Sequence, residues 1–116
     1  MYVLRERVGE RMALNKYFRK DKLTGLPCRE WFLKKMMQLS ANDNYALIDF
    51  DINQFHIFNS IYGFLQGNIV LKRIAAVLRK SCEEGELCAK AENDRFLWLI
   101  KNLNKYQLQE RILKFD

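Results

Sequence analysis

The stretch that most restricts the fold is residues 45–52, an apolar run Y-A-L-I followed by D-F-D-I. Side chains of a strand point alternately to its two faces, so consecutive apolar residues indicate a strand that is covered on both faces. We therefore expect a central strand here. Asp49 and Asp51 lie two residues apart and share one face of this strand, with Asp51 nearer its end.

The remaining segments predict helices around this strand and two further strands. Apolar periodicity predicts helices over residues 3–20, 29–39 and 104–115 and a short helical piece over 55–62. Gly63 and Gly67 bracket a turn, and Asn68 is the expected N-cap of a helix that continues to residue 80. Residues 87–91 and 96–100 predict two strands joined by a tight hairpin at 92–95. This order indicates an α+β fold, an antiparallel sheet with helices on its faces.

Length and composition limit the class of protein. The 116 residues suffice for one small domain, and no apolar run is long enough to span a membrane. Charges stand where a signal peptide would be apolar, so we expect a cytoplasmic protein. The three cysteines, Cys28, Cys82 and Cys88, show neither a disulfide spacing nor a C-x2-C pair, which favours reduced, partly buried thiols over a zinc site.

The net charge of +6 belongs to the N-terminal segment, because residues 36–116 hold ten basic and ten acidic residues. A solvated connector helix over residues 1–20 is the favoured interpretation, since acids are interleaved among the bases. The alternative is a basic module for nucleic acid or an anionic membrane. Its candidate residues are Arg5, Arg7, Arg11, Lys16, Arg19 and Lys20. On the favoured interpretation no nucleic-acid partner is expected.

Two carboxylates become neighbours if the hairpin pairs with the strand over residues 45–52. Asp51 ends that strand and Asp94 lies at the hairpin tip, so the two side chains would converge at one end of the sheet. Converging carboxylates suit a hard cation such as Mg²⁺ that holds a nucleotide phosphate. The alternative is that Asp51 caps the following helical turn and Asp94 is an ordinary hairpin residue.

Five segments in order carry a resemblance to a known family. They are D-K-L-T-G-L-P-C-R at residues 21–29, D-I-N-Q-F at 51–55, F-N-S-I-Y-G at 58–63, G-N-I-V-L at 67–71 and A-K-A-E-N-D-R-F at 89–96. This set resembles GGDEF domains of bacterial cyclic dinucleotide signalling, with Cys28 in place of the usual Asn. The resemblance implies a nucleotide-cyclase or palm-like fold with a ferredoxin-like core over residues 21–116.

The resemblance also implies roles for individual residues. Active family members join two GTP molecules, one held by each of two domains, into cyclic di-GMP. Asp51, the Ile52 carbonyl and Asp94 match Mg²⁺ ligands. Asn59 matches a residue that hydrogen-bonds guanine, and Phe55, from the segment at residues 51–55, is a further expected nucleotide-binding residue. Asn68 replaces a guanine-binding Asp, and an amide accepts hydrogen bonds with its oxygen alone, so recognition of the base should weaken.

The departures from the family pattern fall mainly in the hairpin. Glu92 and Asn93 replace two glycines that allow close approach to the ligand, and Arg95 replaces a catalytic Glu. A cation at that position cannot help to ionise a 3′-hydroxyl as a metal does. Glu83 and Glu86 replace the R-x-x-D residues of the family's product-inhibition site, so we expect no cyclic di-GMP there.

These features predict a degenerate GGDEF domain without catalytic residues. It would regulate an attached EAL or sensor domain and bind GTP and Mg²⁺ weakly or not at all. A homodimer is one expected form of the domain. A residual diguanylate cyclase is the alternative. No segment after residue 100 matches the last strand and helix of the family, so the domain is either C-terminally truncated as a fragment or naturally trimmed. The fragment is favoured, because the strand over residues 46–52 would otherwise expose an edge.

Overall fold

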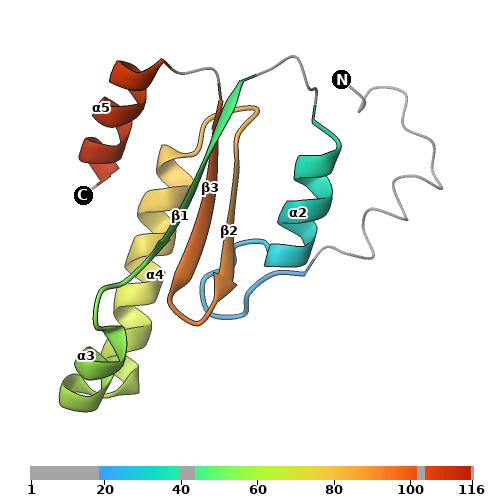
Figure 1. Ribbon diagram of the computed structural model, residues 1–116. Helices are drawn as coiled ribbons and strands as arrows, with labels where there is room; N and C mark the ends of the chain where they lie inside the picture. Colours follow the sequence, from blue (N-terminus) through green and yellow to red (C-terminus); the bar gives the residue numbers. More distant parts are fainter. Residues whose placement is uncertain (1–18, 40–43, 102–103, 116) are drawn as a thin grey trace.

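The computed structural model describes residues 19–39, 44–101 and 104–115. The connector helix predicted over residues 1–20 lies almost entirely outside these described residues. Within them, the elements follow the predicted order: α2 (Arg29–Met37), β1 (Tyr45–Asp51), α3 (Phe55–Tyr62), α4 (Phe64–Ser81), β2 (Leu87–Glu92), β3 (Arg95–Lys101) and α5 (Lys105–Phe115). The chain therefore forms the α+β fold that the sequence predicts (Figure 1).

The three strands form one antiparallel sheet in the order β1-β3-β2. The prediction that residues 45–52 form a central strand is wrong for the described part of the chain, because β3 is central and β1 lies at an edge. The burial pattern agrees: five consecutive residues of β3 are buried, whereas Leu47 and Asp49 of β1 are exposed. The predicted pairing of β1 with the hairpin is confirmed, with Phe50 opposite Phe96 and Asp51 opposite Arg95.

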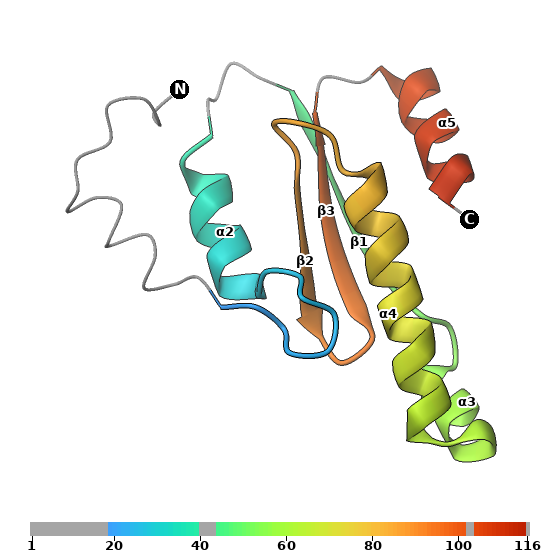
Figure 2. The ribbon, with the colours of Figure 1, turned by 180° about the vertical axis from the view of Figure 1, so that it is seen from behind.

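Helix α4 covers one face of the sheet and helix α2 covers the other (Figures 1 and 2). On the α4 face, Phe96, Trp98 and Ile100 of β3 pack with buried residues of α4, and the rings of Phe50 and Phe96 stack with centroids 5.5 Å apart. On the α2 face, Phe32 packs into a second apolar cluster, whose buried members are Leu87, Ala89, Leu97 and Leu99. Strand β3 is therefore covered on both faces, and this explains why consecutive residues along it are apolar.

Helix α4 begins five residues earlier than the sequence predicts. Gly63, with a positive φ of 89°, separates α3 from α4, and Gly67 and Asn68 lie inside α4. The expected N-cap at Asn68 and the turn at Gly67 are therefore wrong. The physical reason is contact between helices: Gly67 is buried against the side chains of Phe55 and Asn59 of α3, where a larger residue would not fit.

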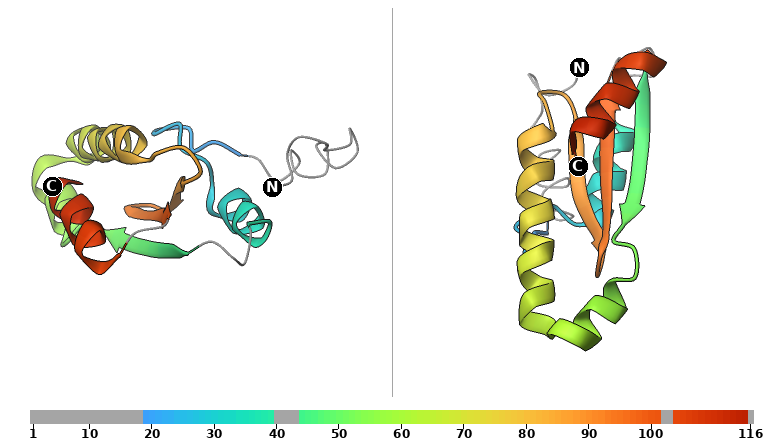
Figure 3. Two further views of the ribbon diagram at one scale, coloured as in Figure 1. Left: turned by 90° about the horizontal axis from the view of Figure 1, so that it is seen from above. Right: turned by 90° about the vertical axis from the view of Figure 1, so that its left-hand side faces the viewer.

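The α3–α4 pair extends beyond the hairpin end of the sheet, and α5 lies near the opposite end (Figure 3). Among the described helices, none is both long and apolar enough to cross a membrane. Cys28, Cys82 and Cys88 are half-buried, and no disulfide joins them in the described part of the chain.

Candidate functional site

The hairpin between β2 and β3 departs from regular pairing at its tip. The register shifts between Lys90 and Glu92, so that Glu92 lies opposite Arg95. Asn93 has a φ of 26°, a value that non-glycine residues adopt rarely and Asn more readily than most. The hairpin therefore closes through an Asn at a position where glycine would be free of strain.

Arg95 forms a two-pronged ion pair with Asp49 of β1. Its Nε donates to Asp49 Oδ1 at 2.7 Å and its Nη2 donates to Oδ2 at 2.9 Å. Hydrogen bonding to Arg95 is the main cause that lowers the pKa of Asp49, and the same bond raises the pKa of Arg95. Asp49 is a partner that the sequence analysis did not identify. The available signal was its position, two residues before Asp51 and hence on the same face as Arg95.

The predicted metal ligands Asp51, Ile52 and Asp94 lie at the same end of the sheet. Asp51 is exposed and lies opposite Arg95. Asp94 lies in the hairpin turn, directly before Arg95 in the chain. The Ile52 carbonyl accepts a hydrogen bond from Phe55 N at 3.3 Å. Asp51 does not cap the next helix, because the N-cap of α3 is Gln54 and no side chain bonds there.

This arrangement is a poor fit for a divalent cation. No group of three or more His, Cys, Asp or Glu residues suited to a metal occurs within the described ranges. Asp51 also contributes to raising the pKa of Arg95, so the guanidinium lies within electrostatic reach of this exposed carboxylate. A fixed positive charge beside a carboxylate opposes the binding of a second cation there.

The predicted nucleotide residues gather where α3 meets α4. Phe55 is buried at the start of α3, and Asn59 lies one turn later with its Oδ1 buried against Gly67. Among the described residues this Oδ1 has no hydrogen-bond partner. Asn68, half-buried, follows Gly67 in α4. The structure thus brings Phe55, Asn59 and Asn68 to one helix junction, separate from the hairpin tip.

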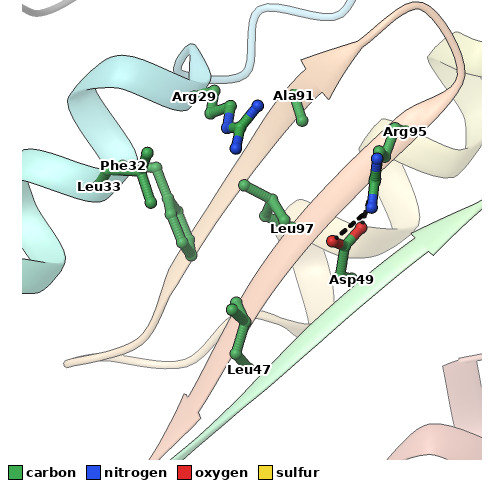
Figure 4. Close-up of a pocket in the computed structure, with 8 residues that line it drawn as sticks. All are labelled: Arg29, Phe32, Leu33, Leu47, Asp49, Ala91, Arg95 and Leu97. Carbon is green, nitrogen blue, oxygen red and sulfur yellow. Dashed lines mark hydrogen bonds and ion pairs between the residues drawn. The ribbon is translucent and has the colours of Figure 1, made fainter.

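A small pocket lies between α2 and the sheet (Figure 4). Arg95 and Asp49 line it, and Arg29 of α2 points into the same space and forms an ion pair with Glu92 at 3.5 Å. The two arginines are therefore each matched by a carboxylate. The rest of the lining is apolar and consists of Phe32, Leu33, Leu47, Ala91 and Leu97.

The segment D-K-L-T-G-L-P forms a tight loop that ties the chain to α4 and β2. The Asp21 carboxylate accepts from Thr24 N and Oγ1, both at 2.8 Å, and forms an ion pair with Lys90. Burial acts to raise the pKa of Asp21, but these hydrogen bonds and Lys90 lower it overall. Arg79 of α4 donates to the Thr24 carbonyl at 2.7 Å. In this structure the segment therefore serves as a scaffold.

Glu86, one of the two acids at the expected inhibition site, is part of an internal network. Its side chain is 2% exposed and accepts hydrogen bonds from Arg111 of α5, from Glu83 N and from Lys101 N. Arg111 also donates to the Ser81 carbonyl at 2.8 Å and lies over the Trp98 ring. Burial raises the pKa of Glu86, but Arg111 and the backbone donors lower it overall. These contacts hold α5 against the end of α4.

Comparison with known proteins places these features in a family. The model of the diguanylate cyclase GGDEF domain matches residues 19–115. The uncharacterized protein y4lL of Sinorhizobium fredii is 25% identical over 103 residues, which cover 85% of this chain and 12% of that protein. This chain therefore spans about an eighth of that curated relative.

Solved structures agree in fold. The diguanylate cyclase SiaD of Pseudomonas aeruginosa, solved in complex with its activator SiaC, is 25% identical with a TM-score of 0.75, over 90% of this chain and 42% of that one. The GGDEF domain of DgcB from Caulobacter crescentus, solved with c-di-GMP, is 19% identical with a TM-score of 0.75, over 83% of this chain and 59% of that one. The family model covers most of the chain, and the chain therefore belongs to the diguanylate cyclase GGDEF domain family.

Proposed function

We propose that this chain is a non-catalytic GGDEF domain that regulates an attached output domain in bacterial cyclic di-GMP signalling. The observation that carries the proposal is the pair between Arg95 and Asp49, at distances of 2.7 and 2.9 Å. In the family pattern the position of Arg95 holds a catalytic carboxylate. Here it holds a cation whose Nε and Nη2 are already engaged.

The chemical argument concerns activation of the attacking hydroxyl. Joining two GTP molecules requires loss of a proton from each 3′-hydroxyl, and a bound metal ion supports this by lowering the pKa of its ligands. The described residues at the hairpin include no group of three carboxylates arranged to hold a metal ion, and Arg95 adds positive charge beside Asp51. We therefore expect no turnover of GTP.

The first experiment measures product directly. The full-length protein is incubated with GTP and Mg²⁺, and cyclic di-GMP is measured by chromatography. We expect none above the background of the Asp51→Ala variant. Formation of cyclic di-GMP by the wild type that disappears in Asp51→Ala would revive the residual cyclase and overturn the proposal.

The second experiment concerns GTP as a regulatory ligand. The grouping of Phe55, Asn59 and Asn68 at the α3–α4 junction supports a weak guanine site. Calorimetry of the full-length protein with GTP and Mg²⁺ should show binding in the high micromolar to millimolar range that Asn59→Ala removes. Absence of heat at millimolar GTP would leave a scaffolding role, in which the domain acts through its contacts alone.

Regulation itself is tested on the output domain. Its activity in the full-length protein should change when residues 19–115 are deleted, and Arg95→Ala should have a smaller effect than the deletion. Equal output activity with and without the domain would contradict a regulatory role. The Asp51→Ala comparison separates a regulatory role from a cyclase, because it measures formation of cyclic di-GMP and does not depend on the output domain.

A further inference from the structure

The junction of α3 and α4 carries an unusual concentration of exposed apolar side chains. Phe64 and Leu65 at the start of α4 are 78% and 79% exposed, and Ile61 and Tyr62 at the end of α3 exceed 60%. Ile57 and Ile69 extend the exposed set along the two helices. We call these six residues the elbow tip. Contiguous apolar surface of this kind on a small domain marks a site of interaction.

The elbow tip lies in the longest uncharged stretch of the chain. Residues 52–71 contain no Asp, Glu, Lys or Arg, although such residues make up 29% of the sequence. Ordinary solvent-exposed helices carry charges on their outer face. The absence of charged residues from this exposed stretch therefore indicates that its surface also contacts a partner less polar than water.

The tip is convex. The contact between the two helices is made by Asn59 and Phe55 with Gly67, so residues two positions away point to the outer sides of the pair. Ile57 and Ile61 of α3 and Leu65 and Ile69 of α4 hold such positions, while Tyr62 and Phe64 flank the bend at Gly63. The pair projects past the hairpin end of the sheet (Figures 1 and 3). The apolar side chains thus surround a projecting end.

Two basic residues lie on α4 at a fixed distance from the elbow tip. Lys72 and Arg73 of α4, both exposed, come seven and eight residues after Leu65, which corresponds to about 10–12 Å along a helix axis. Apolar faces of interfacial helices enter a bilayer by about 5–10 Å, to the boundary of head groups and acyl chains. Lys72 and Arg73 would then stand at the level of the lipid phosphates.

We propose that the elbow tip inserts into the interface of an anionic membrane, with Lys72 and Arg73 at the head groups. The shape and the charge favour this occupant over a second copy of the chain. Two convex ends bury little area against each other. The helix pair itself is basic, because residues 52–82 contain Lys72, Arg73, Arg79 and Lys80 and no acidic residue, and this charge opposes self-association while it attracts anionic lipid. The inference goes beyond the proposed function, because the hairpin has no part in it and Phe55 and Asn59 enter only as the contact between the two helices.

The test is cosedimentation of the full chain with vesicles. One set contains phosphatidylcholine alone and the other contains phosphatidylcholine with 30% phosphatidylglycerol. We expect binding to the anionic vesicles that weakens as salt is raised. Phe64→Ser/Leu65→Ser should weaken this binding at least tenfold, and Lys72→Glu/Arg73→Glu should do the same.

Matched controls separate the tip from general surface effects. Met37→Ser/Leu113→Ser removes two apolar residues that are 77% and 72% exposed elsewhere. Lys105→Glu/Lys114→Glu makes the same charge change on α5. Binding of both control variants to the anionic vesicles should fall less than twofold. Thermal unfolding should show that all variants are folded.

Three outcomes overturn the proposal. One is no binding to anionic vesicles by the wild type, and another is equal binding by the wild type and Phe64→Ser/Leu65→Ser. The third comes from sedimentation velocity without lipid: a dimer that becomes a monomer only in Phe64→Ser/Leu65→Ser would assign the tip to a second copy of the chain.

Discussion

Individual side chains decide the chemistry of this domain, and Arg95 does so most directly. By its resemblance to the family pattern, Arg95 replaces a catalytic Glu. The structure instead gives it Asp49 as a partner, with two hydrogen bonds. The position of Asp49 on the face of Asp51 made it a candidate partner, but the choice of Asp49 depends on the register of β1 against β3. A shift of one residue would turn both Asp49 and Asp51 to the other face of the sheet.

The Arg95–Asp49 pair should contribute little to stability despite its good geometry. Its side chains are 52% and 38% exposed, and screening by solvent leaves an exposed ion pair with little net stabilisation. A double-mutant cycle with Asp49→Asn and Arg95→Gln, followed by urea unfolding, should give a small favourable coupling energy. The same cycle with Asp51→Asn should give a smaller coupling. A larger coupling through Asp51 would show that Arg95 belongs to Asp51 in solution.

Gly67 is the second residue with a specific steric role. A Cβ at this position would overlap Asn59 Oδ1 and lie 3.2 Å from the Phe55 ring. Gly67→Ala should lower the free energy of unfolding by about 1–3 kcal/mol, although Ala alone favours a helix. Asn59→Ala in the same chain should restore part of this loss, as measured by thermal unfolding. Equal losses in the single and double variants would contradict a direct contact.

The helices and strands were largely predictable because their patterns are local. The bounds predicted for residues 55–62 agree with α3, and the hairpin strands were placed to within two residues. The start of α4 was not predictable from the local pattern, since the packing of Gly67 against Phe55 and Asn59 is a contact between two helices. The edge position of β1 also escaped prediction. Its apolar run resembles that of β3, and strand order depends on contacts between distant segments.

Helix α5 is held by one residue more than by its apolar face. Arg111 bonds Glu86 and the Ser81 carbonyl and lies over Trp98, whereas Tyr106 and Leu113 of the same helix are more than 70% exposed. Arg111→Ala leaves the buried Glu86 carboxylate without its cation. We expect it to lower the free energy of unfolding by about 3–5 kcal/mol.

Hydrogen exchange followed by mass spectrometry would locate the effect. Exchange in α5 should rise strongly in Arg111→Ala, and exchange in α2, on the far face of the sheet, should rise much less. Lys114→Ala is the matched control, because Lys114 is exposed on the same helix. Similar exchange of α5 in Arg111→Ala and the wild type would mean that apolar packing alone holds the helix.

At the scale of the molecule, three separate carboxylates tie the elements together. Asp21 joins the N-terminal loop to β2, Asp49 joins β1 to β3, and Glu86 joins the α4–β2 loop to α5. All three have a lowered pKa in the folded chain. The family motif thus identified the loop at Asp21 as important. It did not reveal that Glu86, at a ligand position of the family, has become a structural residue here.

Stability should therefore fall in acid. A carboxyl whose pKa is lower in the folded chain stabilises it fully above the pKa of the unfolded chain, about 4 for Asp and Glu. That contribution is lost as the pH falls through the folded pKa. The free energy of unfolding, measured in urea, should be nearly constant between pH 6 and 7 and fall steadily below about pH 4.5. A rise below that pH would contradict the assigned directions.

Glu86→Gln isolates the most buried of the three groups. At pH 7 the variant lacks the charge that pairs with Arg111, so it should be less stable than the wild type by about 2–3 kcal/mol. As the pH falls from 7 toward 3, the wild type loses the same charge by protonation, and the two stability curves should converge. Glu84→Gln, an exposed neighbour on the same loop, should stay within about 0.5 kcal/mol of the wild type throughout. If the difference in free energy of unfolding between the wild type and Glu86→Gln does not narrow, the loss arises from the geometry of the amide. The charge on Glu86 would then not be what holds α5.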